Sequence, residues 1–524
     1  MTEFQAVPAP ASSPSPISKL YDDLLWAIFR QNANNTQREV EDKTPALRTL
    51  VYTSLVCSKW RNLTLSLPSL WADVINLDIL SNEEWRKEFV KRAGDIPLSV
   101  VCHKEVDGDR NTELTVSFLE EHWERIRYLD IRMGYINWRN FEERIWGVLA
   151  RPAKELEVFR FFPPLDRFNM DRKPLYVIRP TDFTLFSNEA PVLHTFHAPG
   201  IKPNLTAPWF AGVRDLSLTG PLQVNELLSA LSHMHCLEVL QDNCDAIIAA
   251  TEGTVLPHAT CPSLKSIIIS TCRSIRPYRE LITHLLPAST CALSFSVVAD
   301  ENFAFDALAL SDVSRILQML PNYCDLSSAT SLSVTLHSRT FDFQAVLPHN
   351  VPCVFFLALA SASDVSDNYM QVLLSTLASL PLHNANKLSL SIGESADISY
   401  VDPEVAEFLS SFSFARQLEL SSDTIQFILT LPQEVQDIAF PSVDKVYLTT
   451  CSNELDVICI QVFLSARIAV GRPVAELDVR ISEFSMGIDL SCLEEFYGLK
   501  VSLLFDGFKR DYVCGSGLVG DLVV

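Results

Sequence analysis

The hydrophobic positions near the start of the chain predict a small cluster of helices. The first apolar stripe recurs at helical spacing and consists of Leu20, Leu24, Leu25, Ile28 and Phe29. Asp22 and Asp23 fall in the first turn of this predicted helix, where negative charge is favourable next to the helix dipole. Thr44 and Pro45 then predict the start of a second helix, with threonine as the N-cap and proline at the first helical position.

A second apolar stripe follows in the same segment. Val56, Trp60 and Leu63 stand at helical spacing, and Leu70 and Trp71 close the segment. So short a stretch holds few residues for a core, yet Trp60, Trp71 and several leucines belong to it. We therefore expect part of this apolar surface to face a partner.

Residues 17–74 resemble the F-box, the adaptor-binding motif of ubiquitin-ligase substrate receptors. The first half of that motif reads Leu-Pro-x-Glu, two aliphatic residues, two variable residues and Ile-Phe, and residues 20–29 match it. The second half reads Val-Cys-x-x-Trp-Arg followed by Leu-Trp, and it matches residues 56–61 with Leu70 and Trp71. The chain departs from the motif at Tyr21, which stands in place of the proline.

The resemblance implies a non-catalytic substrate-receptor subunit of an SCF-type cullin-RING ubiquitin ligase. Such a subunit binds a Skp-type adaptor, and through it a cullin, and it presents a protein target for ubiquitin transfer. The residues implied to dock on the adaptor or to shape the docking surface are Leu20, Leu24, Leu25, Ile28, Phe29, Val56, Trp60, Leu70 and Trp71.

Two other interpretations of this segment stay open. It could be a plain helical cap whose tryptophans and leucines only fill a core. It could also be a degenerate F-box in a protein-interaction scaffold that does not engage the ligase. Tyr21 and the long polar connection at residues 31–44 favour that alternative.

Beyond this segment, short runs with apolar residues two apart recur to the end of the chain and predict strands. They are residues 96–101, 126–131, 156–159, 193–196, 213–218, 264–269, 332–336, 387–390, 417–420, 446–448 and 477–481. Segments of helical period precede many of them, at residues 224–231, 279–286, 313–320, 370–380, 424–431 and 457–468. Four of these segments end in Leu-Pro, which we expect to terminate the helix.

The strands recur at the spacing of repeat proteins. One strand and one helix cannot bury their own apolar faces, so stacking them predicts a parallel sheet with a helix layer on one side. This part resembles the irregular leucine-rich repeats that accompany F-boxes, although most repeats lack the regular Asn or Cys of tidy repeats. The alternative is a conventional doubly wound α/β domain.

The expected fold class is therefore α/β, with a small all-α F-box-like unit followed by a leucine-rich-repeat-like solenoid of parallel strands and helices. The expected organisation is a disordered leader at residues 1–16, the F-box-like unit at 17–78, a linker helix at 79–95 and the solenoid at 96–524.

The composition of the chain indicates which classes of partner are not expected. With 42 basic and 64 acidic residues, the formal charge of −22 repels phosphate backbones and anionic lipid, so neither nucleic acid nor membrane is an expected partner. The 13 cysteines are scattered, mostly inside apolar runs, which is typical of reduced thiols. No signal peptide is visible at the N-terminus, and the longest apolar run, residues 351–362, is too short to span a bilayer. The expected location is the cytoplasm, the nucleus or both.

The sequence contains no candidate catalytic, cofactor or metal site. The string Gly515-Ser516-Gly517-Leu518-Val519-Gly520 matches a dinucleotide fingerprint, but too few residues follow it to form the required helix. His233, His235, Cys236 and Cys244 lack the spacing of a zinc site and predict a solvated turn with one buried cysteine. We expect no enzyme activity, no cofactor and no metal.

Overall fold

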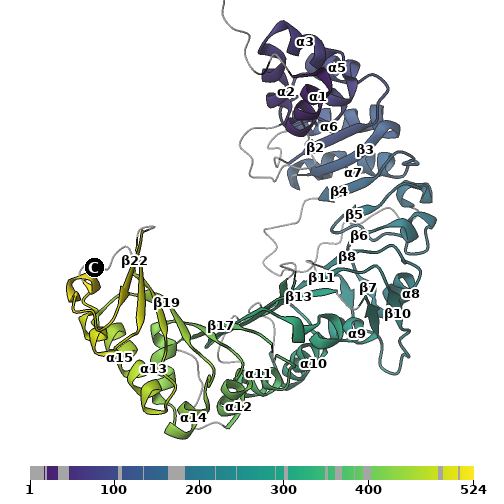
Figure 1. Ribbon diagram of the computed structural model, residues 1–524. Helices are drawn as coiled ribbons and strands as arrows, with labels where there is room; N and C mark the ends of the chain where they lie inside the picture. The colour runs from purple at the N-terminus through teal and green to yellow at the C-terminus, as the bar shows by residue number, and fades with distance from the viewer. Residues whose placement is uncertain are drawn as a thin grey trace, which may run out of the picture. The chain divides into compact units, whose positions relative to one another are not determined.

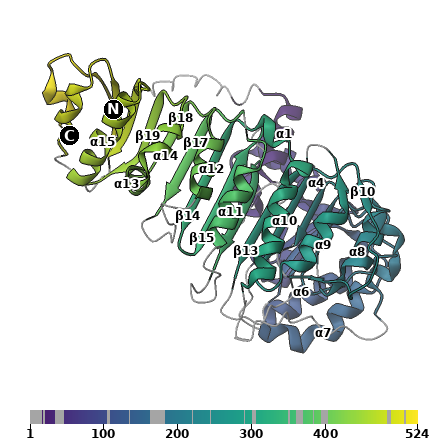
Figure 2. The ribbon, with the colours of Figure 1, turned by 90° about the horizontal axis from the view of Figure 1, so that it is seen from below.

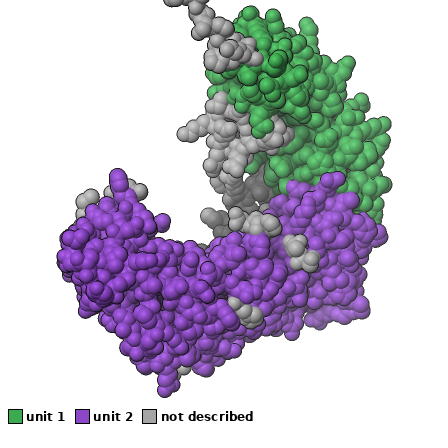
Figure 3. Space-filling model, in the orientation of Figure 1, with its two compact units in different colours: residues 1–212 green, residues 213–524 purple. Residues whose placement is uncertain are grey.

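The computed structural model describes residues 17, 20–33, 46–103, 109–133, 135–162, 183–218, 220–242, 245–288, 291–299, 305–348, 352–359, 369–382, 384–393, 403–481, 488–505 and 508–523. The chain divides into two compact units, unit 1 at Met1–Gly212 and unit 2 at Val213–Val524 (Figure 3). The expected leader at residues 1–16 lies outside the described residues.

Unit 1 begins with helices and continues with alternating strands and helices. Its helices are α1 (Asp22–Asn32), α2 (Ala46–Leu55), α3 (Ser58–Leu65), α4 (Pro68–Ala72), α5 (Glu83–Ala93), α6 (Asp109–His122) and α7 (Tyr135–Leu149). Its strands are β1 (Ile75–Asn76), β2 (Leu98–Cys102), β3 (Ile126–Arg132), β4 (Val158–Phe162) and β5 (Thr195–His197).

The strands of unit 1 form a parallel sheet in chain order. β1 pairs with β2, β2 with β3, β3 with β4 and β4 with β5. Because β1 at Ile75–Asn76 follows α4 directly, the first strand of this sheet lies inside the segment expected to be purely helical. Helix α5, the expected linker, packs on α4: the rings of Trp71 and Phe89 lie 5.2 Å apart, edge to face. The helical cluster and the first strands thus belong to one compact unit, and the expected boundaries at residues 78 and 95 stay predictions.

Unit 2 repeats strands and helices over about 300 residues. Its main strands are β6 (Asp215–Ser217), β8 (Val239–Asp242), β11 (Ser266–Thr271), β13 (Ala292–Val298), β14 (Ser331–His337), β15 (Thr340–Val346), β16 (Pro352–Ala358), β17 (Lys387–Ile392), β18 (Gln417–Leu420), β19 (Lys445–Cys451), β20 (Glu476–Ile481), β21 (Lys500–Phe505) and β22 (Phe508–Val513). Four short strands form two separate parallel pairs, β7 (Leu222–Gln223) with β9 (Ile247–Ile248) and β10 (Ala259–Cys261) with β12 (Leu285–Pro287). Its helices are α8 (Val224–Leu231), α9 (Arg276–His284), α10 (Ala307–Tyr323), α11 (Tyr369–Ala378), α12 (Pro403–Ser411), α13 (Ser422–Thr430), α14 (Gln433–Ile438) and α15 (Glu454–Ala469).

Most neighbouring strands of unit 2 are parallel, which confirms a mixed α/β fold with a mostly parallel sheet. The parallel pairs are β6–β8, β8–β11, β11–β13, β13–β16, β14–β17, β17–β18, β18–β19, β19–β20 and β20–β21. Helices α9 to α15 lie side by side along one face of this sheet (Figures 1 and 2). Strand β14 shows the resulting alternation, with Leu332, Val334 and Leu336 buried and the intervening residues half-buried. We call the face without helices, among the described elements, the open face.

The sheet is not parallel throughout, and here the expectation needs correction. β15 lies between β14 and β16 and is antiparallel to both, so these three strands form an insert in the parallel order. Only Ser338 and Arg339 separate β14 from β15, and so short a connection can join only antiparallel neighbours. A second antiparallel pair lies at the C-terminal end of the sheet, where β22 is antiparallel to β21.

Two of the four Leu-Pro pairs do not end a helix as expected. α10 continues through Pro321 to Tyr323, because proline in the last turn removes only one hydrogen bond from a helix that is about to end. α9 ends at His284, so Leu286 and Pro287 belong to strand β12 instead. Within the described part of the chain, no helix is both long enough and apolar enough to cross a membrane.

Candidate protein-interaction surface

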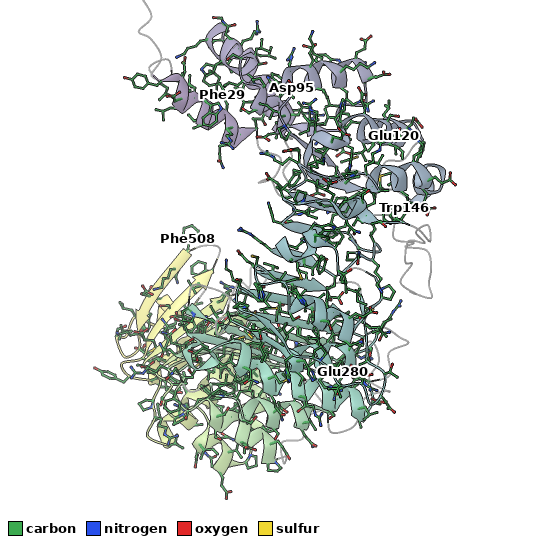
Figure 4. All side chains as sticks on the ribbon, turned by 90° about the vertical axis from the view of Figure 1, so that its right-hand side faces the viewer. Phe29, Asp95, Glu120, Trp146, Glu280 and Phe508 are labelled. Atoms are coloured by element: carbon green, nitrogen blue, oxygen red, sulfur yellow. The ribbon has the colours of Figure 1, made fainter. Side chains whose placement is uncertain are left out.

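Helix α1 is apolar on two faces, and only one of them is buried. Leu25 and Phe29 are each 1% exposed, whereas Leu24 is 51% exposed and Ile28 is 44% exposed. The inner face packs on α3, where the ring of Phe29 meets the ring of Trp60 edge to face at 4.9 Å. Figure 4 labels Phe29 on this helix. The outer face leaves Leu24 and Ile28 in solvent, beside the N-cap Tyr21, which is also exposed.

Polar contacts fix α1 against α3. Lys59 Nζ lies 3.0 Å from Asp22 Oδ1 and donates to the Leu20 carbonyl at 3.3 Å. The Cys57 side chain caps α3 by accepting from the Trp60 amide. α1 is therefore held on α3 by an exposed charge pair at its start and by the buried Phe29 near its end.

A second set of apolar side chains is exposed at the end of α2. Tyr52, Leu55 and Val56 are each about 60% exposed. We call these three residues with Tyr21, Leu24 and Ile28 the apolar surface set. Sequence reasoning identified Leu24, Ile28 and Val56 but missed Tyr52 and Leu55. Their signal was present, because Tyr52, Leu55 and Val56 stand at i, i+3 and i+4.

The end of the cluster is a core rather than a surface. Leu70 and Trp71 are 1% and 0% exposed. The Trp71 indole donates to the Thr64 carbonyl at 2.9 Å, and the guanidinium of Arg92 lies 4.7 Å from its ring centre. Trp71 thus joins α3, α4 and α5.

The nine residues implied by the F-box resemblance therefore fall into three groups. Leu24, Ile28 and Val56 are exposed, and Leu20 and Trp60 are partly exposed. The buried members are Leu25, Phe29, Leu70 and Trp71. In this arrangement a partner can touch the first two groups, whereas the buried group shapes the helices that carry them.

The open face of unit 2 offers a different kind of surface. Near its end, charges on neighbouring strands are paired: Lys387 lies 2.7 Å from Glu419, and Lys445 lies 3.0 Å from Asp478. Although burial opposes it, hydrogen bonds to Asp478, Tyr447 and Glu476 raise the pKa of Lys445. The middle of the face is more neutral. There Asp342 stands on β15, and burial raises the pKa of its carboxyl.

Two buried thiols lie in surroundings that disfavour nucleophilic chemistry, and the described residues show no metal cluster. Burial raises the pKa of Cys261 to about 11 and that of Cys451 to about 12, so these thiols stay protonated at neutral pH. Among the described residues, no group of three or more His, Cys, Asp or Glu side chains could hold a metal ion.

The motifs set aside in the sequence take part in local structure. His233 bonds through Nδ1 to the Ser229 carbonyl oxygen at 2.9 Å, and Cys236 is exposed, whereas Cys244 lies outside the described residues. The glycine string forms a turn in which the Gly517 amide donates to the Glu494 carboxylate at 2.8 Å.

Comparison of the chain with protein-family models and with curated proteins finds no match.

Proposed function

We propose that this protein is a non-catalytic substrate-receptor subunit of an SCF-type cullin-RING ubiquitin ligase. The observation that carries the proposal is the double-faced helix α1, whose sequence resembles the F-box and whose Leu24 and Ile28 point into solvent while Leu25 and Phe29 fill the core. A soluble helix rarely leaves several large apolar side chains exposed together unless they meet a partner.

In this proposal the exposed and partly exposed residues have one role and the buried residues another. Leu24, Ile28 and Val56, with the partly exposed Leu20 and Trp60, contact a Skp-type adaptor. Leu25, Phe29, Leu70 and Trp71 hold the helices that present them. The adaptor connects the protein to a cullin.

The remainder of the chain is proposed to be a leucine-rich-repeat-like solenoid that binds the protein target. The support is the repeated strand and helix, the mostly parallel sheet and the open face, on which alternate side chains are available to a ligand. The formal charge of −22 supports a protein target rather than nucleic acid or an anionic membrane. The free thiols of the described cysteines support a location in the cytoplasm or nucleus.

Co-expression with a Skp-type adaptor, followed by size-exclusion chromatography, tests the proposal. We expect co-elution at one to one, and its loss in Leu24→Asp. An unpaired charge buried in the interface costs about 3–5 kcal/mol, which is at least about a hundredfold in affinity. Because Leu24 is half exposed, the free variant should stay folded.

Trp85→Asp is the matched control for this experiment. Trp85 is 58% exposed and lies on α5, outside the apolar surface set, so its replacement should leave co-elution intact. If Leu24→Asp still co-elutes as the parent does, the assignment of α1 to the adaptor is wrong.

The second candidate is an interaction scaffold with a degenerate F-box. Tyr21, exposed at the N-cap of α1 in place of the motif's proline, favours it. Failure of a well-folded parent chain to co-elute with the adaptor would support the scaffold.

A further inference from the structure

Unit 2 contains a row of buried cysteines that recurs with its repeats. Cys261, Cys291, Cys324 and Cys353 follow one another at intervals of 30, 33 and 29 residues. Each lies at the start of a main strand or shortly before one, and all four are 0% exposed. Regular placement in the repeats brings thiols that are far apart in the sequence close together in space.

Two of these thiols are in contact. The Sγ atoms of Cys324 and Cys353 lie 3.1 Å apart. Cys324 is the C-cap of α10, held by its amide donating to the Leu320 carbonyl at 2.9 Å, and Cys353 lies in β16 opposite Ala345. A disulfide bond is about 2.05 Å long, so the two sulfurs need to approach by only about 1 Å.

The surroundings of the pair distinguish its two members. The hydrogen bond between the two thiols, helped by a backbone hydrogen bond at Leu293, lowers the pKa of Cys324 even though burial opposes the effect. The same contact, together with burial, raises the pKa of Cys353. Of the two thiols, Cys324 is therefore the one that loses its proton more readily.

We propose that Cys324 and Cys353 form a redox modification site that a peroxide converts into an intramolecular disulfide. The Cys324 thiolate attacks one oxygen of hydrogen peroxide, the O–O bond breaks, and the products are a sulfenic acid and, after protonation, water. The Cys353 sulfur then attacks the sulfenic sulfur, the S–O bond breaks, and the Cys353 proton leaves with the second water. Two thiols and one peroxide thus give one disulfide and two waters.

The disulfide closes a loop that contains all of β14 and β15. It therefore ties the end of α10 to the antiparallel insert and stops that insert from unfolding separately. Closing a loop of about 30 residues restricts the unfolded chain, and for a unit of this size we expect the midpoint of thermal unfolding to rise by about 5 °C. Because both sulfurs are buried, the reaction requires local opening and should be accelerated by low concentrations of urea.

Peptide mapping of the reduced full-length protein tests the proposal directly. The folded protein is treated with hydrogen peroxide, the excess is destroyed with catalase, free thiols are alkylated in denaturant, and the digest is analysed by mass spectrometry. We expect a peptide that links Cys324 to Cys353 and disappears on reduction. Full alkylation of both cysteines after prolonged treatment, or linkage of either one to another cysteine, overturns the proposal.

Variants and hydrogen exchange provide a second test. Cys324→Ser should lose both the linkage and the rise in the unfolding midpoint. Cys451→Ser, at another buried thiol on β19 outside the loop, should keep both. In the parent chain, oxidation should slow exchange at Ser331–His337 and Thr340–Val346. A rise in the midpoint that persists in Cys324→Ser shows that another group is responsible and contradicts the assignment.

Discussion

At the scale of single residues, Tyr21 sets how the chain enters α1. Its backbone has φ −66° and ψ 152°, and its carbonyl accepts from the amides of Leu24 and Leu25. Proline fixes φ near this value, so the backbone already has the conformation that the motif's proline imposes. The tyrosine therefore changes the side chain presented beside Leu24 without changing the course of the chain.

We predict that Tyr21→Pro leaves the fold intact. Stability should be unchanged or increased by up to about 1 kcal/mol, because proline restricts the unfolded chain at a position whose native φ it fits. If Tyr21 weakens the adaptor contact, the affinity should rise as well. Urea unfolding and titration with the adaptor measure the two effects. Marked destabilisation would show that the φ argument fails.

Single residues also show why the sequence alone could not tell the exposed apolar side chains of α1 from the buried ones. Leu24, Leu25, Ile28 and Phe29 form one broad apolar stripe, and the spacing alone does not reveal which side is buried. That choice depends on Trp60, which meets Phe29 from another helix. The segment could be located from the sequence, whereas the division into exposed and buried residues required the packing.

At the scale of elements, Arg144 of α7 forms ion pairs and a hydrogen bond with side chains of α6. Arg144 of α7 lies 2.6 Å from Glu120 and 2.8 Å from Glu113, both on α6, and it also donates to Ser117. The hydrogen bond from Arg144 lowers the pKa of Glu120. In Figure 4, Glu120 and Trp146 mark these two helices.

We predict that this contact stabilises unit 1 in a pH-dependent way. Because the pKa of Glu120 is lower in the folded state than in the unfolded state, its contribution is present at neutral pH and is lost as the pH falls below about 4.5. Glu120→Gln should therefore destabilise the protein at pH 7 by up to about 1 kcal/mol, since the pair is partly exposed. The difference between the variant and the parent should shrink by pH 3.

Urea unfolding at the two pH values measures this difference. Glu121→Gln is the matched control. The Glu121 carboxylate is next to Glu120 in the sequence and 69% exposed, but it does not contact Arg144 in the described structure. An effect of Glu120→Gln that is equal at both pH values would contradict the role of ionisation.

Many elements of unit 2 were predictable from the sequence. The segments at residues 332–336, 387–390, 417–420 and 477–481 all lie in strands, because alternation of leucine with polar residues is a local signal. β13, β15, β16, β21 and β22 were missed, although β13 and β15 alternate in the same way. The run that contains β16 has almost no polar residues to mark the alternation, and its pairing with β13 depends on residues nearly 60 positions away. For the same reason, the contact between Cys324 and Cys353 could not be read from their spacing.

At the scale of the whole molecule, the two units have their own cores. In unit 1, Trp71 is fully buried between α3, α4 and α5 and bonded to Thr64. In unit 2, the rings of Phe295, Phe341 and Phe355 pack together across β13, β15 and β16. Each unit is large enough to unfold cooperatively by itself.

We predict that Trp71→Ala destabilises unit 1 alone. Loss of a buried tryptophan costs about 3–5 kcal/mol. Hydrogen exchange should become faster in α3 to α5 and in the sheet of unit 1, while β13 to β17 keep their protection. Equal acceleration in both units would show that they unfold as one.

The antiparallel insert has a consequence for a chain that is made from its N-terminus. In a simple series of repeats, each new strand pairs with the one before it as it leaves the ribosome. Here β13 is complete at Val298, but its neighbour β16 ends only at Ala358, and the strand synthesised next, β14, pairs elsewhere. The free edge of β13 therefore waits for roughly 60 residues of further synthesis, several seconds at ordinary elongation rates. During that interval β13 is paired only with β11, and its free edge can pair with another chain.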